Sequence, residues 1–532
     1  MEVVCTARMI IKSPYPNVEI PEVPLTSFVL QRAAELGDKP ALIEATTGRT
    51  LTYAQLTENI RRAAVNLSQR GFKQGDVFGI LSSNNLEYAI VLHSVATLGG
   101  VVTTINPLYT DHEIAHQLED SKARFLVTVP ACLDKAKAAA REAGIEELFV
   151  FGSCEGATSF DDLLVENDRP LPAVEINPLE DLVALPYSSG TTGLPKGVML
   201  THHNLVANLI QMDGLDYFDD SDTLIAVLPM FHIYGLVVVL NMGLYKGATI
   251  VIMPRFDLEG FLKAAQDYDV TLAHVVPPIV LQLSKNPIVD NYKLSKLKTL
   301  FSGAAPLGVE LTQACIDRLG CGLRQGYGMT ETSPVTHSSP SPRSQVKFGS
   351  VGVAAPNTEC KIADVETGAP LPRGERGEVC VRGPQIMKGY LNNPVATAHT
   401  IDAEGWLHTG DIGYADEDGH FFIVDRLKEL IKYKGFQVPP AELEAVLLSH
   451  PCVADAAVIP LHDDEAGEVP KAIVVLKEHS EPDAILQFLA QRVAPHKRIK
   501  HLEFVEQIPK SPSGKILRRL LVQRERERAA QQ

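Results

Sequence analysis

The sequence predicts an α/β fold with a β-rich subdomain, followed by a smaller C-terminal domain. Three features lead to this prediction. Short apolar segments alternate with amphipathic ones along most of the 532 residues, which is typical of strands and helices in largely parallel sheets. From residue 352 to residue 383 the pattern changes to short strands separated by Gly and Pro turns. Near Asp425 a new alternation begins, which indicates a further small domain.

The strands and helices of the N-terminal part can be assigned from their apolar patterns. We expect strands at residues 76–81, 101–106, 249–253 and 271–276. We expect amphipathic helices at residues 87–97 and 258–267. In the β-rich part, strands are expected at residues 377–383 and 419–424.

The C-terminal domain is expected to combine helices and strands within about a hundred residues. A helix opens at Pro440, with three apolar side chains on one face, Leu443, Val446 and Leu447. Residues 452–460 and 471–476 have the composition of strands. A second helix is indicated by the spacing of Ile485, Leu489 and Val493.

The composition limits the classes of function. Apolar residues make up 45% of the chain and charged residues 21%, which is ordinary for a globular protein with room for a sizeable core. Lys and Arg number 49 against 65 Asp and Glu, which gives a formal charge of -16. This acidic balance argues against nucleic-acid binding, since phosphate backbones require an excess of basic residues. A local basic patch for a small phosphorylated ligand remains compatible with it.

Cysteine spacing and targeting signals predict a cytoplasmic protein that does not bind membranes. The eight cysteines contain no C-x-x-C pair, so the spacing signals neither a zinc site nor a redox dithiol, and buried reduced thiols are expected. The N-terminal segment lacks the apolar core of a signal peptide, and the last residues are not a peroxisomal signal. The longest apolar stretch, residues 233–245, is too short to span a bilayer.

The most informative motif is Tyr-Ser-Ser-Gly-Thr-Thr-Gly-Leu-Pro-Lys-Gly-Val at residues 187–198. Its glycines allow close approach of the backbone to a ligand, and its backbone N–H groups and hydroxyls offer donors to anionic oxygens. Pro195 and Gly197 exclude the P-loop of kinases and GTPases. A flexible polar loop would be the ordinary interpretation of a random Gly/Ser/Thr run, but this ordered string ending in Lys196 favours a polyphosphate site.

A second motif is Gln-Gly-Tyr-Gly-Met-Thr-Glu at residues 325–331. It fails as a dinucleotide fingerprint, because Glu331 occupies the third glycine position. The glycines beside Tyr327 would suit a purine, Thr330 a phosphate, and Glu331 is an oxygen ligand suited to Mg²⁺. A tight turn is the alternative interpretation of this motif when it is taken alone.

Two weaker motifs contain charged residues. His-Thr-Gly-Asp at residues 408–411 and the pair Asp425 and Arg426 would supply a carboxylate and a guanidinium for two ribose hydroxyls, or simply form a surface ion pair. The other motif consists of Lys428, Lys432, Lys434, Gly435, Gln437 and the distant Lys515. Lys428 and Lys432 are one helical turn apart, so a solvated charged face is the alternative for that motif.

In this order and spacing, the four motifs resemble those of the adenylate-forming superfamily, which includes acyl-CoA synthetases, firefly luciferases and adenylation domains of peptide synthetases. Residues 228–234, 301–307, 377–383 and 425–437 are most similar to 4-coumarate:CoA ligases. The resemblance extends over nearly the whole chain. It implies a large N-terminal domain of layered α/β subdomains at residues 1–425 and a small mobile C-terminal α+β lid at residues 426–532.

The resemblance implies a two-step reaction with ATP, Mg²⁺ and coenzyme A. A carboxylate attacks the α-phosphorus of ATP to give an acyl-adenylate and pyrophosphate, and the CoA thiol then displaces AMP. The implied ATP and AMP contacts are Ser188, Ser189, Gly190, Thr191, Thr192, Gly193, Lys196, Ala304, Gln325, Gly326, Tyr327, Thr330, Asp411, Arg426, Lys428, Lys432, Gln437 and Lys515. The implied metal ligand is Glu331.

Catalytic and CoA-binding roles follow from the same resemblance. The implied catalytic residues are Lys515, His232, Lys428, Lys434 and Gln437. Lys515 would bridge the carboxylate and the α-phosphate, and Lys428 would mark the hinge about which the lid rotates. The implied CoA contacts are Arg255, Lys434 and Gly435.

The resemblance also implies the acyl pocket and its substrate. The lining would be His232, Ile233, Tyr234, Val238, Phe301, Ala304, Gly326, Gly328, Pro334 and Val335. The Tyr234 hydroxyl would pair with a substrate para-hydroxyl, which favours 4-coumarate and related hydroxycinnamates. Phe301 and Val238 depart from the plant pattern and make the pocket tighter and more apolar.

Other functions remain open at this stage. The alternatives are a medium- or long-chain fatty acyl-CoA synthetase, a luciferase-like oxygenase and an inactive nucleotide-binding regulator. Joint presence of Lys515, Lys434 and Glu331 argues against the regulator. The expected partner is a small-molecule carboxylic acid, with no nucleic acid and no membrane, and the chain is expected to be a monomer or a weak homodimer.

Overall fold

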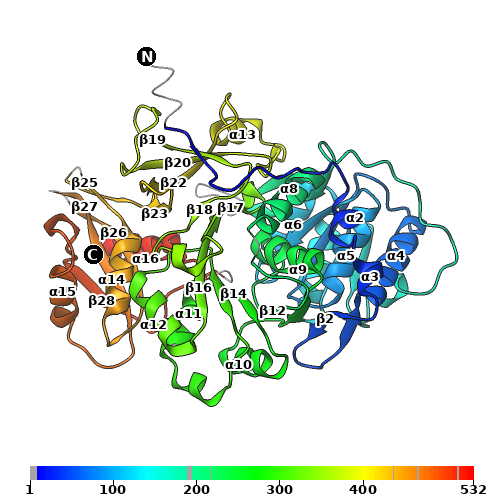
Figure 1. The fold of residues 1–532 in the computed structure, drawn as a ribbon, viewed down its shortest axis with the longest axis horizontal. Helices are drawn as coiled ribbons and strands as arrows, with labels where there is room; N and C mark the ends of the chain where they lie inside the picture. Colours follow the sequence, from blue (N-terminus) through cyan, green and yellow to red (C-terminus); the bar gives the residue numbers. More distant parts are fainter. Residues whose placement is uncertain are drawn as a thin grey trace.

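The computed structural model describes residues 9–188, 195–215, 217–434, 436–463, 466–511 and 514–531. Within these residues the strands form four sheets, two of nine strands and two of five. Figure 1 shows the helices and sheets of the α/β part in blue to green, the β-rich sheet in yellow and the C-terminal domain in orange and red. The predicted fold class, a layered α/β domain with a β-rich subdomain and a small α+β domain, is confirmed.

The first α/β sheet has a parallel core. Its neighbouring strands are β5 (Val101–Ile105), β4 (Val77–Leu81), β6 (Ala123–Thr128) and β7 (Glu147–Val150). Helix α5 (Glu87–Thr97) connects β4 to β5, as predicted. All five residues of β5 are buried, which is typical of a parallel strand covered on both faces. Four aromatic rings pack together in this core and stabilise it, those of Phe72, Phe78, Phe125 and Phe149.

The second α/β sheet positions part of the candidate site. Its parallel strands are β13 (Thr249–Ile252), β12 (Thr223–Ala226), β14 (Leu272–Val275), β15 (Thr299–Ser302) and β16 (Gly322–Gly328). Helix α10 (Leu258–Asp267) follows β13, as predicted, and Asp257 caps it by accepting the Gly260 N–H at 2.7 Å. The carboxyl ends of β15 and β16 are adjacent, and ligands of open α/β sheets bind at that edge.

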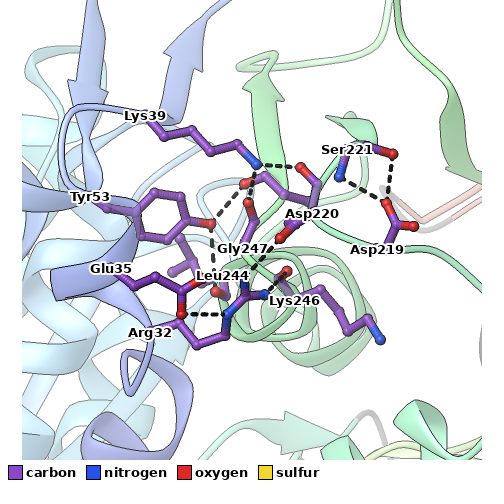
Figure 2. A network of polar contacts seen from close by, with 11 residues as sticks. Arg32, Glu35, Lys39, Tyr53, Asp219, Asp220, Ser221, Leu244, Lys246 and Gly247 are labelled. Atoms are coloured by element: carbon purple, nitrogen blue, oxygen red, sulfur yellow. Dashed lines mark hydrogen bonds and ion pairs between the residues drawn. The ribbon is translucent and has the colours of Figure 1, made fainter.

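Strand β2 (Pro40–Glu44) and the residues just before it are tied to the second sheet. Strand β2 pairs in parallel with β13. Figure 2 shows the polar contacts that hold this region together. Arg32 Nη2 donates to Asp220 Oδ2 at 2.8 Å. Lys39 Nζ donates to Gly247 O at 2.6 Å, so the start of the chain is tied to the end of the helix before β13.

The β-rich subdomain is an antiparallel five-stranded sheet. Its strands, in spatial order, are β1 (Ile11–Lys12), β19 (Glu359–Ala363), β20 (Gly377–Arg382), β22 (Leu407–Ala415) and β23 (Phe421–Arg426). Alternate side chains of the sheet form a separate apolar core that includes Ile362, Val379 and Phe421. The strands predicted at residues 377–383 and 419–424 are confirmed.

The C-terminal domain has its own sheet and core. Its strands are β24 (Ile431–Tyr433), β25 (Phe436–Val438), β26 (Val453–Asp463), β27 (Gly467–Leu476) and β28 (His501–Phe504). Its helices are α14 (Pro440–Ser449), α15 (Pro482–Ala490) and α16 (Arg518–Gln531). The core contains Leu443, Leu447, Ile485 and Leu489, as their spacing predicts. The domain boundary at residues 425/426 stays a prediction.

Two local expectations for this domain were wrong. Lys428 and Lys432 do not share a helical face, because Lys428 lies in a turn and Lys432 lies in β24. Buried Ile431 beside exposed Lys432 is the two-residue alternation of a strand, which outweighs the four-residue spacing of the lysines. Val493 lies beyond α15, because the chain turns where Arg492 N–H donates to Leu489 O.

None of the helices in the described part of the chain combines the length and the apolar character needed to cross a bilayer.

Gly235 allows the tight packing of the π-helix at Tyr234–Asn241. A Cβ atom at this position would lie 2.7 Å from the carbonyl carbon of Pro229, which is backbone and cannot move aside. We therefore expect Gly235→Ala to lower the free energy of unfolding by about 1–3 kcal/mol through overpacking. Thermal unfolding measures this change. Gly308→Ala is the control, because its nearest contact would be an ordinary 3.6 Å; equal midpoints for the two variants would contradict the packing argument.

Candidate functional site

A cleft of about 2350 Å³ lies where the second α/β sheet, the β-rich sheet and the C-terminal domain meet. Its walls include the carboxyl ends of β15 and β16, the facing strands β22 and β23, helix α14 and the segment around Lys515. In Figure 1, the orange and red C-terminal domain lies beside β22 and β23. The cleft therefore brings together segments that are up to several hundred residues apart.

A buried carboxylate lies at the centre of the cleft wall. Tyr327 donates its hydroxyl to Asp411 Oδ2 at 2.5 Å, and Arg426 Nε lies 3.4 Å from Asp411 Oδ1. Asp411 and Arg426 are direct partners across β22 and β23. Burial raises the pKa of Asp411, and the Arg426 charge opposes this rise. Burial and the Asp411 charge raise the pKa of Tyr327 well above its usual value. The phenol therefore stays protonated and donates a hydrogen bond to Asp411.

A bulge in β22 presents Asp411 to the cleft. Glu378 is opposite Ile412 while Cys380 is opposite His408, so β22 has extra residues between these pairs. Gly410 sits in the bulge with φ 69°, a conformation that favours glycine. Its N–H donates to Glu378 Oε1 at 2.9 Å. Glu378 thus holds the turn from which Asp411 points toward Tyr327 and Arg426.

Lys515 enters the same cleft from the C-terminal domain. It follows Gly514, where an added Cβ would lie 3.1 Å from Val276 Cγ2 of the N-terminal domain, so this loop packs closely on the larger domain. Ser511 N–H donates to Lys515 O at 2.8 Å and closes the loop. Partial removal from bulk water and then the Arg426 charge lower the pKa of Lys515. Its ammonium is still accessible to a ligand within the cleft.

A second charged group lies near the predicted phosphate loop. Glu331 is buried, and its Oε1 accepts the Tyr390 hydroxyl at 2.8 Å. Lys196, at the start of β11 (Lys196–Thr201), places its Nζ 4.8 Å from the centroid of the same Tyr390 ring. Ser188 and Thr330 also line the cleft. The loop residues Ser189, Gly190, Thr191, Thr192 and Gly193 lie outside the described residues.

All ten residues predicted for the acyl pocket line the cleft. They are His232, Ile233, Tyr234, Val238, Phe301, Ala304, Gly326, Gly328, Pro334 and Val335. Tyr217 packs edge-on against Phe301, with ring centroids 4.8 Å apart. Burial and then the Lys515 charge lower the pKa of His232 to about 4, so this imidazole is neutral at pH 7. The pocket is therefore aromatic and weakly charged.

The Tyr234 hydroxyl already has protein partners. It lies 3.2 Å from His274 Nδ1 and 3.4 Å from Phe301 O. Burial lowers the pKa of His274 to about 3, so a neutral ring faces the phenol. Sequence reasoning missed His274, whose only signal was a single polar residue inside the apolar strand β14. Tyr234 is thus held in place before any substrate hydroxyl arrives.

Several predicted residues do not line the cleft. Gln325 is buried, and its side-chain amide donates to Leu307 O at 3.4 Å. Arg255, Lys432 and Lys434 are exposed and are not part of the cleft lining. Lys428 does line the cleft. Loss of hydration between the cleft walls, and then the Arg426 charge, lower the pKa of Lys428 to about 8. The cleft thus contains most of the described residues that were predicted to bind ATP and the acyl substrate. The predicted CoA residues Arg255 and Lys434 lie outside it.

Two further predicted residues cannot be placed. Gly435 lies outside the described residues, and for Gln437 only the backbone, in β25, is described.

The chain is similar over most of its length to known enzyme families and proteins. Residues 29–391 match the model of the AMP-binding enzyme family, and residues 442–515 match that of the AMP-binding enzyme C-terminal domain. 4-Coumarate--CoA ligase 1 of Petroselinum crispum is 47% identical over 522 residues, which cover 96% of either chain. A 4-coumarate--CoA ligase of Vanilla planifolia is 47% identical over 527 residues, 96% of this chain and 95% of that protein.

Solved structures are similar in fold over nearly the whole chain. The anthranilate CoA ligase AuaEII in complex with anthranoyl-AMP has a TM-score of 0.89 at 26% identity, covering 96% of this chain and 99% of that one. ATP-bound MatB from Rhodopseudomonas palustris has a TM-score of 0.84 at 30% identity, covering 95% and 99%.

The Tyr327–Asp411 hydrogen bond generates a prediction about nucleotide affinity. Tyr327→Phe removes the donor and leaves a buried carboxylate oxygen unpaired. A hydrogen bond to a charged group contributes about 1.5–3 kcal/mol, so ATP affinity should fall by about 10- to 150-fold. Calorimetric titration with ATP measures this. Tyr414→Phe, which keeps its ring stack on Phe422, is the control; an unchanged Kd for Tyr327→Phe would contradict the role given to this bond.

Proposed function

The chain belongs to the adenylate-forming family of AMP-binding enzymes, and we propose that within it the protein is an ATP-dependent, AMP-forming acid:CoA ligase acting on 4-coumarate or related hydroxycinnamates. The observation that carries this proposal is the meeting of Asp411 and Glu331 of the large domain, Arg426 at the predicted domain boundary and Lys515 of the C-terminal domain in one cleft. The identity of 47% to 4-coumarate--CoA ligases over 96% of the chain supports the substrate class.

The chemical difficulty lies in the first step, in which an anionic carboxylate attacks an anionic phosphate. The attack forms a bond from the carboxylate oxygen to the α-phosphorus and breaks the bond to pyrophosphate. Lys515 lies near enough to Arg426 and Asp411 for their charges to act on it. We assign Lys515 the role of bridging the two reacting anions, the carboxylate and the α-phosphate. Fixed cations in a partly desolvated cleft stabilise the developing charge without reorganisation.

We assign the nucleotide contacts among the residues that line the cleft. Asp411 and Arg426 would bind the ribose, and Tyr327 the adenine. Ser188, Lys196 and Thr330 would contact the phosphates, together with the loop residues 189–193. Gln325 has no direct part in this assignment, because its side chain is turned toward Leu307.

The residues near Glu331 suit the Mg²⁺ ion that the family implies. Glu331 is buried beside Tyr390, and one of its carboxylate oxygens accepts the Tyr390 hydroxyl. The other oxygen is a hard donor of the kind that Mg²⁺ prefers. Glu331 would hold the ion, whose charge would neutralise phosphate oxygens, while Lys196 adds a fixed positive charge on the same side.

The second step requires a rearrangement of the C-terminal domain. Lys434 is exposed and outside the cleft, whereas Lys515 is inside it. We propose that the C-terminal domain rotates about Lys428 after adenylation, which withdraws Lys515 and brings Lys434 and Gly435 toward the CoA thiol. Arg255, exposed on the large domain, would contact the CoA phosphates. The thiol then attacks the acyl carbon and AMP leaves.

The shape of the acyl pocket favours a planar aromatic acid over a fatty acid. Phe301, Tyr217 and Tyr234 form one wall, and flat rings suit stacking against it. A panel of acids assayed with ATP and Mg²⁺ tests the whole proposal. Acid-dependent pyrophosphate release, limited to about one turnover without CoA and continuous with it, is expected. Release of phosphate and ADP, or activity confined to long-chain acids, would contradict the proposal.

Location and assembly stay predictions. Cell fractionation tests the cytoplasmic location, and light scattering tests the expected monomer or weak homodimer.

Lys515→Ala separates the two steps. Because we assign Lys515 to the adenylation step only, pyrophosphate formation should fall by about 10²–10³-fold. Thioester formation from supplied acyl-adenylate should stay near the wild-type rate, as measured by chromatography of the acyl-CoA product. Lys500→Ala, at an exposed lysine of the same domain, is the control. Equal losses in both steps would exclude the assigned role.

Tyr234→Phe tests substrate selection. Removing the hydroxyl should reduce the kcat/KM preference for 4-coumarate over cinnamate, because a substrate hydroxyl loses a partner worth about 1–3 kcal/mol. The ratio of kcat/KM for the two acids measures this. A ratio unchanged from that of the wild type would show that Tyr234 only packs against His274 and Phe301.

A further inference from the structure

Three chemically different metal ligands lie together on the β-rich sheet. Glu378 and Cys380 are two residues apart on β20, so their side chains share one face, and His408 is the cross-strand partner of Cys380 on β22. His408 Nδ1 lies 2.8 Å from Glu378 Oε2 and 3.5 Å from Cys380 Sγ. The thiol lies 4.0 Å from Glu378 Oε2. In the part of the chain that the structure describes, these atoms form a group suited to a metal ion.

The spacing of the three ligand atoms suits a tetrahedral zinc ion. Zinc bonds of about 2.0–2.3 Å to nitrogen, oxygen and sulfur imply distances of roughly 3.3–3.7 Å between ligand atoms. Of the observed distances, 3.5 Å falls within that range, 2.8 Å lies below it and 4.0 Å lies above it. Small changes of side-chain torsion would therefore admit the ion, while the paired strands keep the backbone in place.

Each half-buried ligand, Glu378 and His408, has an outer partner of the kind found around metal sites. His408 Nε2 lies 3.5 Å from Asp402 Oδ2, which leaves Nδ1 to face the thiol and Glu378. Asp402 is itself fixed, because its Oδ1 accepts the Trp406 N–H at 2.9 Å. Glu378 Oε1 accepts the Gly410 N–H and leaves Oε2 toward His408. These partners orient the ligand atoms before any ion binds.

The group is reachable from the cleft. Glu378 and His408 line it, whereas Cys380 is buried behind them. Burial and then the Glu378 charge raise the pKa of the Cys380 thiol to about 12. The metal-free cysteine is therefore protonated, and binding would break the S–H bond, release the proton to solvent and form a sulfur–metal bond. A fourth coordination position would stay open to water.

We propose that Glu378, Cys380 and His408 form a binding site for a borderline divalent cation such as Zn²⁺, separate from the Mg²⁺ position near Glu331. Thiolate and imidazole ligands select Zn²⁺ over Mg²⁺. The same Glu378 holds Gly410, the residue before Asp411. The second part of the inference rests on the proposed function. When the ion draws Glu378 toward itself, the turn at Gly410 loosens, Asp411 is held less firmly, and ATP binding weakens.

Metal titration of the chelator-treated full chain tests the site directly. Calorimetry with Zn²⁺ and absorption spectroscopy with Co²⁺ are the readouts, because a cobalt–thiolate bond gives a charge-transfer band. We expect one ion per chain. Cys380→Ser and His408→Asn should each weaken binding by at least about 10-fold and, for the serine variant, abolish the band. Cys321→Ser, at another buried cysteine, is the control and should change neither.

The outcomes separate the two parts of the inference. Zn²⁺ affinity that is unchanged in a folded Cys380→Ser or His408→Asn variant, or a Co²⁺ spectrum without a thiolate band, overturns the site. If Zn²⁺ binds as expected, calorimetry with ATP on the Zn²⁺-loaded protein should give a Kd at least about 5-fold higher than on the metal-free protein, and the shift should disappear in Cys380→Ser. An equal Kd would overturn the coupling to Asp411 while leaving the site established. Failure of ATP to bind even the metal-free protein would instead contradict the proposed function.

Discussion

The buried carboxylate of Asp411 is the constraint on which the organisation of the site depends. A carboxylate in this position is costly unless cations and donors surround it. Tyr327 supplies a proton donor at 2.5 Å, and Arg426 supplies the positive charge across the β22–β23 pair. The bulge held by Glu378 positions Asp411 itself, and the carboxyl end of β16 positions its donor Tyr327. Lys515, brought in from the other domain, adds a further cation, and the resulting cleft suits a ligand with several negative charges.

The junction between the two domains includes a polar contact. Asp425 Oδ2 accepts the N–H of Ala441 at 2.8 Å. Close to this contact, but within the C-terminal domain, Arg518 lies 2.6 Å from Glu444 and 2.5 Å from Glu429. Burial raises the pKa of Glu444 to about 7, against the opposing charge of Arg518. Polar junctions are typical of domains that move relative to each other. The contact between Asp425 and Ala441 at the junction therefore suits the proposed lid, which would change position between the two reaction steps.

The sequence predicts the secondary structure and the fold of this protein more fully than it predicts the contacts within the site. Alternating apolar segments were sufficient for the α/β layers, and α5 and α10 begin and end where expected. Motifs such as residues 325–331 predict their site because the carboxyl ends of parallel strands meet at one edge. His274 was missed because its partner Tyr234 lies 40 residues away in the π-helix. The group at Glu378 was missed because it depends on the pairing of β20 with β22. Cysteine spacing indicated no zinc site, because the ligands facing Cys380 come from β20 and β22 and not from a local repeat.

The central claim is that the carboxylate substrate attacks the α-phosphorus of ATP within this cleft. Oxygen-isotope transfer tests it most directly. With 4-coumarate labelled with ¹⁸O in the carboxylate, ATP, Mg²⁺ and CoA, mass spectrometry of the products reports which phosphorus was attacked. The account predicts one ¹⁸O atom in the AMP and none in the pyrophosphate, because CoA displaces AMP together with the bridging oxygen. ¹⁸O in inorganic phosphate, or unlabelled AMP beside labelled coumaroyl-CoA only, would contradict it.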